Sequence, residues 1–168
     1  MAKDVRIYKY ESRKDAEARI RSAKRLVVIL IPLLQGEAEI LHTHRKSIMS
    51  EALWKLTEAE TQKYKTRYCS KAVWELPDLD SAGIDLIHEH VFQKAIMAEQ
   101  LLRDVSMDVK KTLENAFGCV VTKKEHDRLA DYGHEDGWKR YRMAGIAVVN
   151  AEKSDRTTGK VSFVPQTL

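Results

Sequence analysis

The chain has 168 residues, a length that predicts a single domain able to bury a core without disulfides or a structural metal. Its two cysteines, Cys69 and Cys119, fit no metal-ligand spacing, so we expect a reduced, cytoplasmic compartment. The formal net charge is +4 and the pI is about 9.0, which favours an anionic partner such as nucleic acid or an acidic protein surface. The longest apolar run, residues 26–34, is too short to cross a bilayer and contains Pro32, so no membrane segment is expected.

The excess of positive charge lies in the first 25 residues. Ser12 and Asp15 have the spacing of a capping box, which predicts a basic helix that ends near Arg25. The apolar run that follows fits a buried strand or a continuation of the helix, and we favour the helix. Lysine and arginine neutralise phosphates, so this segment is a candidate nucleic-acid surface, although a solvated helix face is the simpler alternative. The predicted contacts are Arg13, Lys14, Arg21, Lys24 and Arg25.

Apolar residues recur with helical spacing over most of the first 118 residues. They predict three helices, over residues 37–56, 57–76 and 84–105. A fourth, shorter helix is expected to begin at Ser106 and to end at Gly118. In the helix over residues 37–56, the expected inward stripe includes Leu41, His44 and Ile48. In the helix over residues 84–105, it includes Ile84, Ile87, Val91, Ala98 and Leu102. Alternation near the N-terminus, over residues 5–10, predicts a short strand.

The last third of the chain has a different pattern. Residues 119–121 and 146–149 are candidate strands, and residues 161–164 are a possible hairpin partner for the second. A capping box from Thr122 to Glu125 predicts a short helix, and residues 138–143 predict one or two helical turns. We therefore expect a single α+β domain that is predominantly α-helical. Residues 1–118 would form the helical body, and residues 119–168 a small α/β part that supplies most of the sheet.

Two His-x-His pairs, His42–His44 and His88–His90, hold four of the six histidines. In a strand the two imidazoles of such a pair point the same way, whereas in a helix they are about 200° apart and cannot share an ion. Both pairs fall in predicted helices, so chelation by either pair is not expected. His44 and His88 could instead meet between helices as metal ligands, although buried, hydrogen-bonded core histidines are the alternative.

Imidazole and carboxylate groups also support proton transfer. His88, Glu89 and His90 are therefore the candidate catalytic residues of a histidine-dependent hydrolase, such as a nuclease or phosphodiesterase, with or without a metal. The sequence contains no phosphate-binding glycine loop, no nucleophile elbow and no H-E-x-x-H motif, and it identifies no cofactor.

A second aromatic and basic segment covers residues 138–142. It comprises Trp138, Lys139, Arg140, Tyr141 and Arg142. Aromatic rings stack on bases and cations neutralise phosphates, so this composition suits single-stranded nucleic acid. The alternative is that Trp138 and Tyr141, three residues apart, anchor a short helix on the core.

Together these patterns favour a small cytoplasmic protein that binds nucleic acid or another anion, with no catalytic role assumed. A histidine-dependent hydrolase is one alternative. The other is an accessory or inhibitory protein that docks on a larger complex and regulates it. The oligomeric state is not predicted.

Overall fold

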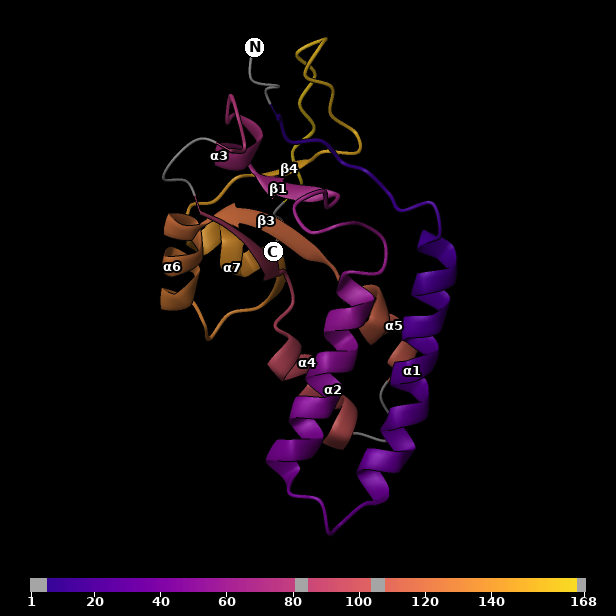
Figure 1. Ribbon diagram of the computed structural model, residues 1–168. Coiled ribbons are helices and arrows are strands. Elements are labelled where there is room, and N and C mark those ends of the chain that lie inside the picture. Colours follow the sequence, from indigo (N-terminus) through magenta and orange to yellow (C-terminus); the bar gives the residue numbers. More distant parts are fainter. Residues whose placement is uncertain (1–5, 81–84, 104–107, 166–168) are drawn as a thin grey trace. The chain divides into compact units, whose positions relative to one another are not determined.

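The computed structural model describes residues 6–80, 85–103 and 108–165 (Figure 1). Within these residues the chain forms seven helices and one four-stranded mixed sheet, which confirms a mainly helical α+β fold. The chain divides into two compact units. Unit 1 comprises residues 1–12, 61–89 and 118–168, and unit 2 comprises residues 13–60 and 90–117. Both units combine separate stretches of chain, so neither coincides with the predicted parts 1–118 and 119–168.

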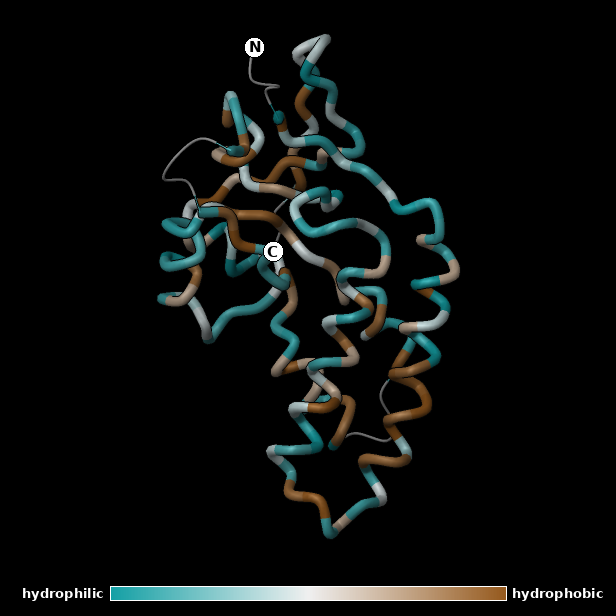
Figure 2. Tube along the Cα trace, viewed as in Figure 1, coloured by the Kyte–Doolittle hydropathy of each residue, from teal (hydrophilic) through white to brown (hydrophobic). Residues whose placement is uncertain are grey.

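Unit 2 is helical. It contains α1 (Ala16–Gly36), α2 (His42–Thr57), α4 (Lys94–Arg103) and α5 (Val109–Glu114). Helix α1 continues through the apolar run and past Pro32, as expected, and Figure 2 shows its change from a hydrophilic first half to a hydrophobic second half. The capping box predicted at its start does not form, because Asp15 is the N-cap and its side chain makes no capping hydrogen bond. Among the described helices, none combines the length and the apolarity that crossing a membrane requires.

The core of unit 2 lies between α1, α2 and α4. Val27, Met49, Leu53 and Leu101 are almost completely buried there. The predicted inward stripe of α2 was largely wrong: Leu41 is 65% exposed, Ile48 is 42% exposed and His44 is exposed, whereas Ala52, which continues the same spacing, is buried as expected. Helix α2 begins only at His42, after Leu41, and it turns the side chains around Met49 and Leu53 towards the core.

The helix predicted over residues 84–105 was also wrong. Residues 86–90 form a strand, β2 (Leu86–His90), and among the described residues of this range the helix covers 94–103. Val91, Ala98 and Leu102 are nevertheless buried as expected, Ile87 is half-buried, and Ile84 lies outside the described residues. The apolar residues of the strand and of the helix after it happen to be three and four positions apart across the junction. Together they therefore imitate the pattern of one continuous helix.

The helix predicted from Thr57 to Pro77 is absent from the described structure. Thr57 is the last residue of α2, and the segment contains a short strand, β1 (Tyr68–Ser70), followed by α3 (Lys71–Trp74). The predicted helix from Ser106 to Gly118 is shorter in the structure: Ser106 lies outside the described residues, and Asp108 caps α5. Gly118 begins a strand instead of ending that helix.

The sheet of unit 1 has the order β2-β3-β1-β4, in which β3 is Gly118–Thr122 and β4 is Val148–Asn150. Strand β1 pairs in parallel with β3, and antiparallel with β4 through Cys69 opposite Val149. Val149 also bridges Phe163, which is the hairpin pairing expected for residues 161–164. Described residues 6–10 form no strand, although Tyr8 is buried and its hydroxyl lies 2.9 Å from the Thr66 carbonyl oxygen.

Two helices of the last third lie on one face of this sheet (Figure 1). They are α6 (Lys123–Asp131) and α7 (Gly137–Met143). The predicted capping box at Thr122 is confirmed, because its side chain accepts a hydrogen bond from the backbone N–H of Glu125 while the Glu125 carboxylate accepts one from the backbone N–H of Thr122. These helices place the polar cluster described next.

Candidate functional site

Glu89 on β2 joins side chains from three elements of unit 1. One carboxylate oxygen, Oε2, lies 2.7 Å from Nδ1 of His126 on α6, and the other, Oε1, accepts a hydrogen bond from the guanidinium of Arg140 on α7. The side chains of Arg140 and Glu89 are only 6% and 14% exposed, whereas that of His126 is 40% exposed. A buried carboxylate held by an arginine therefore fixes one nitrogen of a half-exposed imidazole.

A second buried carboxylate lies beside this cluster in the sequence. Glu125 accepts a hydrogen bond from Ser70 Oγ at 2.6 Å, in addition to its part in the capping box, and its Oε1 is 3.9 Å from Arg128. These contacts tie the start of α6 to β1. Glu125 therefore has a structural role. Glu89 and His126 are the pair of side chains suited to acid–base chemistry.

His88 faces away from Glu89, because successive side chains alternate along a strand. It is 7% exposed and packs against β3 at Gly118, where a Cβ atom would overlap its imidazole. Burial, helped by the charge of Lys63, lowers the pKa of His88 to about 4. His88 is therefore a neutral core histidine at physiological pH.

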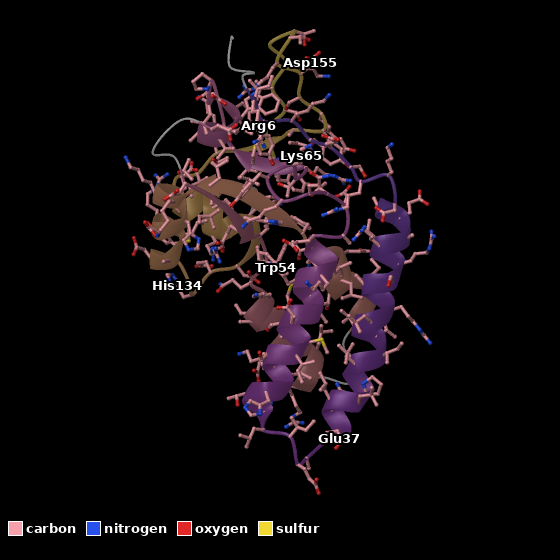
Figure 3. The ribbon with its side chains drawn as sticks, in the orientation of Figure 1. Arg6, Glu37, Trp54, Lys65, His134 and Asp155 are labelled. Carbon is pink, nitrogen blue, oxygen red and sulfur yellow. The ribbon has the colours of Figure 1, made fainter. Side chains whose placement is uncertain are left out.

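His90 belongs to the packing of unit 2. Its ring lies 4.8 Å from that of Trp54, a residue of α2 labelled in Figure 3, and its Nδ1 is 3.3 Å from Thr57 Oγ1. The strand does direct His88 and His90 to the same side, but the two imidazoles pack in the cores of different units. The predicted catalytic set His88, Glu89 and His90 is therefore not assembled within either unit.

The predicted metal ligands are not brought together either. His44 is exposed on α2, whereas His88 is buried in unit 1. The other histidine of the first pair, His42, contacts Glu99 at 3.0 Å, and this hydrogen bond is the main reason that the pKa of Glu99 falls to about 2. In the described parts of the chain, no three histidine, cysteine or acidic side chains are grouped as metal ligands.

The aromatic and basic segment at residues 138–142 is divided between surface and core. Tyr141 and Arg140 are buried, and Trp138 makes edge contacts with Tyr141 at 5.4 Å and with Tyr68 at 5.2 Å. The core-anchor alternative therefore describes Trp138 and Tyr141, and Arg140 is held by Glu89. Lys139 is exposed and lies 2.9 Å from Glu135, and Arg142 is half-buried, so the segment presents no row of aromatic rings to a ligand.

The two cysteines are also core residues. Both are buried, and burial raises the pKa of the Cys69 thiol and of the Cys119 thiol well above the usual range. Thiols that stay protonated at neutral pH are poor nucleophiles. This removes cysteine chemistry from the candidate activities.

The predicted basic contacts, on α1 and in the residues just before it, lie on the surface of unit 2. Lys14, Arg21 and Arg25 are exposed, and Arg13 and Lys24 are half-buried. Arg13 also lines a hollow of about 380 Å³ together with Arg19 of α1 and Lys55 of α2. Two ion pairs partly neutralise the helix, from Arg19 to Asp15 at 2.7 Å and from Arg21 to Glu17 at 3.7 Å. Both pairs are exposed, so each contributes little to stability and can be exchanged for other anions.

The sequence patterns pointed to Glu89 as catalytic and to Arg140 as a nucleic-acid contact, but they indicated neither the link between these two residues nor His126. His126 lies 37 positions from Glu89 and Arg140 lies 51 positions away, and only the fold brings them together. The signal in the sequence was the polar pair Glu125–His126 directly after a capping box, which places His126 on the first turns of a helix without indicating its neighbour. Comparisons with protein-family models, curated proteins and solved structures found no match to this chain.

Proposed function

We propose that the protein binds nucleic acid through the basic first half of α1. The observation that supports this proposal is the set of cations around the hollow of unit 2. Arg13, Arg19 and Lys55 line it, and on the adjoining helix surface Arg21 neighbours both Lys24 and Arg25, which lie three and four residues further along. In the described part of the chain, no ion pair engages Lys14, Lys24 or Arg25.

Cations arranged in this way recognise phosphates rather than bases. Lysine and arginine contacts to the backbone release counterions and carry little sequence information. The aromatic residues of the segment at 138–142 are committed to packing in unit 1, so they do not add base stacking to this surface. The proposal is therefore sequence-independent binding of a strand, with an affinity that falls as the salt concentration rises.

The test is a fluorescence anisotropy titration of labelled single-stranded RNA and DNA at low salt. Reversing two charges in Arg21→Glu/Arg25→Glu should weaken binding about tenfold or more for all sequences alike. The matched control is Lys153→Glu/Lys160→Glu, which changes the net charge equally at two exposed lysines of unit 1. Equal losses in both variants, or no complex with the unmodified chain, would contradict the proposal.

A second candidate is acid–base catalysis in a hydrolase, and the contact between Glu89 and His126 favours it. A carboxylate that holds one imidazole nitrogen fixes the ring orientation, and the other nitrogen can then exchange a proton with a water or a substrate hydroxyl. The 40% exposure of His126 gives a substrate access to the ring. Arg140 is buried, so its part would be to position Glu89.

This candidate is tested by the hydrolysis of RNA and of bis(4-nitrophenyl) phosphate. Glu89→Gln and His126→Gln should both reduce the rate, whereas His134→Gln, at an exposed histidine of the same unit, should not. An absence of turnover by the unmodified chain, or equal rates in all variants, would remove it. An accessory role on a larger complex stays a prediction.

A further inference from the structure

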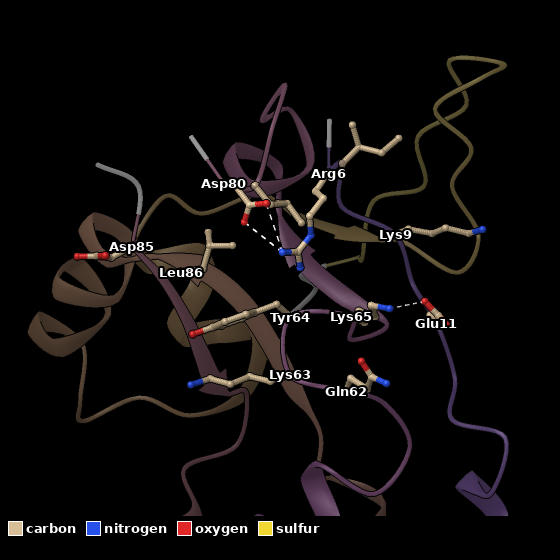
Figure 4. A pocket seen from close by; sticks show the side chains of 12 residues that line it. Arg6, Lys9, Glu11, Gln62, Lys63, Tyr64, Lys65, Asp80, Asp85 and Leu86 are labelled. Atoms are coloured by element: carbon tan, nitrogen blue, oxygen red, sulfur yellow. Dashed lines mark hydrogen bonds and ion pairs between the residues drawn. The ribbon is translucent and has the colours of Figure 1, made fainter. Parts of the chain in front are cut away.

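A second hollow, of about 670 Å³, lies in unit 1 (Figure 4). Its walls come from the N-terminal segment, from residues 62–65 and from the start of β2. The volume falls within the range of small-molecule sites in proteins. None of the residues that line it belongs to the basic surface of α1 or to the cluster around Glu89.

Tyr64 in the wall of this hollow has an unusual backbone conformation. Its φ is +66°, the one positive φ at a non-glycine residue in the described structure. A bulky side chain is strained in this region, and such residues cluster at functional sites. The ring is half-buried and packs partly against the core that contains Tyr8 and Trp74. Asparagine or glycine would adopt this φ with less strain. Packing against the core alone therefore does not explain a tyrosine at this position.

One lysine lies over the ring of Tyr64. Lys63 Nζ lies 5.0 Å from the centroid of the Tyr64 ring, and the two side chains extend in the same direction in Figure 4. Two other cations of the wall are held by carboxylates: Arg6 lies 3.3 Å from Asp80 and Lys65 lies 2.5 Å from Glu11. Lys9 and Lys63 have no carboxylate partner among the described residues. Lys63 therefore places a positive charge without a carboxylate partner beside the aromatic ring, while Asp85 adds a third carboxylate to the same wall.

We propose that this hollow binds a nucleoside phosphate. The base would stack on Tyr64, and the phosphates would meet Lys63 and the neighbouring cations, because aromatic rings and lysines recognise these two parts of a nucleotide. The carboxylate of Asp85, on the same wall, can accept hydrogen bonds from sugar hydroxyls or base amino groups. This site is independent of the proposed strand binding by α1, since the two sets of residues belong to different units.

The test is isothermal titration of the full chain with ADP, and with adenosine and inorganic phosphate as separate ligands. ADP should bind saturably with a dissociation constant of about 1 mM or lower. Adenosine and phosphate should each bind more weakly than ADP, because each lacks one of the two recognised parts. The Arg21→Glu/Arg25→Glu variant should bind ADP as the unmodified chain does, which separates this proposal from the proposed function.

Variants of the wall test the roles of the ring and the lysine. Tyr64→Asn tolerates the positive φ but lacks the ring, so it should weaken ADP binding about tenfold while the thermal unfolding midpoint stays the same or rises. Tyr64→Phe should keep the affinity, and Lys63→Ala should lose it, with Lys153→Ala as the matched control. The proposal is overturned if ADP gives no saturable heat, if phosphate alone binds as well as ADP, or if Tyr64→Asn and Lys63→Ala bind ADP normally.

Discussion

His88 occupies a space that exists because residue 118 is a glycine. A side chain at that position would overlap the imidazole, so the first residue of β3 and the third residue of β2 are matched in size. The sequence pattern indicated a histidine of possible chemical interest, but it contained no sign of this contact across 30 positions. The same contact gives the glycine at position 118 a reason other than the helix end that was expected there.

The stability of the fold should depend on the protonation of His88. Its pKa falls from 6.5 to about 4 on folding, so between these values the unfolded chain binds more protons than the folded chain. The free energy of unfolding should therefore rise with pH across this window, and the contribution of His88 should reach about 3 kcal/mol at most. Urea unfolding at a series of pH values measures this effect.

The variant His88→Gln separates this contribution from those of other titrating groups. It should flatten the dependence of unfolding free energy on pH, whereas His44→Gln, at an exposed position of α2, should leave the dependence unchanged. If the unmodified chain and His88→Gln show the same slope between pH 4 and 6.5, then His88 is not the buried neutral group described above.

Helix α6 was predicted correctly from a local signal at its end. The capping box at Thr122 marks the start of α6 through side-chain and backbone groups only three residues apart. Strand β2 has no such signal, because Leu86–His90 is followed by a helix and the apolar residues of the two elements combine into one helical pattern. Its identity is decided by pairing with β3, which is a contact between distant parts of the chain.

The capping box should contribute measurably to the stability of the fold. Thr122→Ala removes the side chain that accepts the Glu125 N–H and should lower the free energy of unfolding by about 1 kcal/mol. Thr122→Ser keeps the hydroxyl and should retain most of that stability. Chemical denaturation of the three proteins compares them, and equal midpoints for the alanine and serine variants would show that the cap contributes nothing.

The division into two units could not be predicted from composition. No stretch rich in proline, glycine or serine marks a boundary, and each unit is assembled from stretches that alternate along the chain. The candidate sites follow the same division: the basic residues of α1 belong to unit 2, whereas the Glu89 cluster and the nucleotide-sized hollow belong to unit 1. The basic segment was found from the sequence because its charges are contiguous, and the other two sites were missed because their residues are not.

The salt dependence of strand binding tests the proposed function most directly. For single-stranded nucleic acid, each phosphate contact contributes about −0.7 to the slope of log affinity against log salt. If the five predicted cations of the α1 segment all contact phosphates, the slope should be about −3.5, and Arg21→Glu/Arg25→Glu should reduce its magnitude by about 1.4. An unchanged slope in that variant, or a slope near zero in the unmodified chain, would contradict binding through α1.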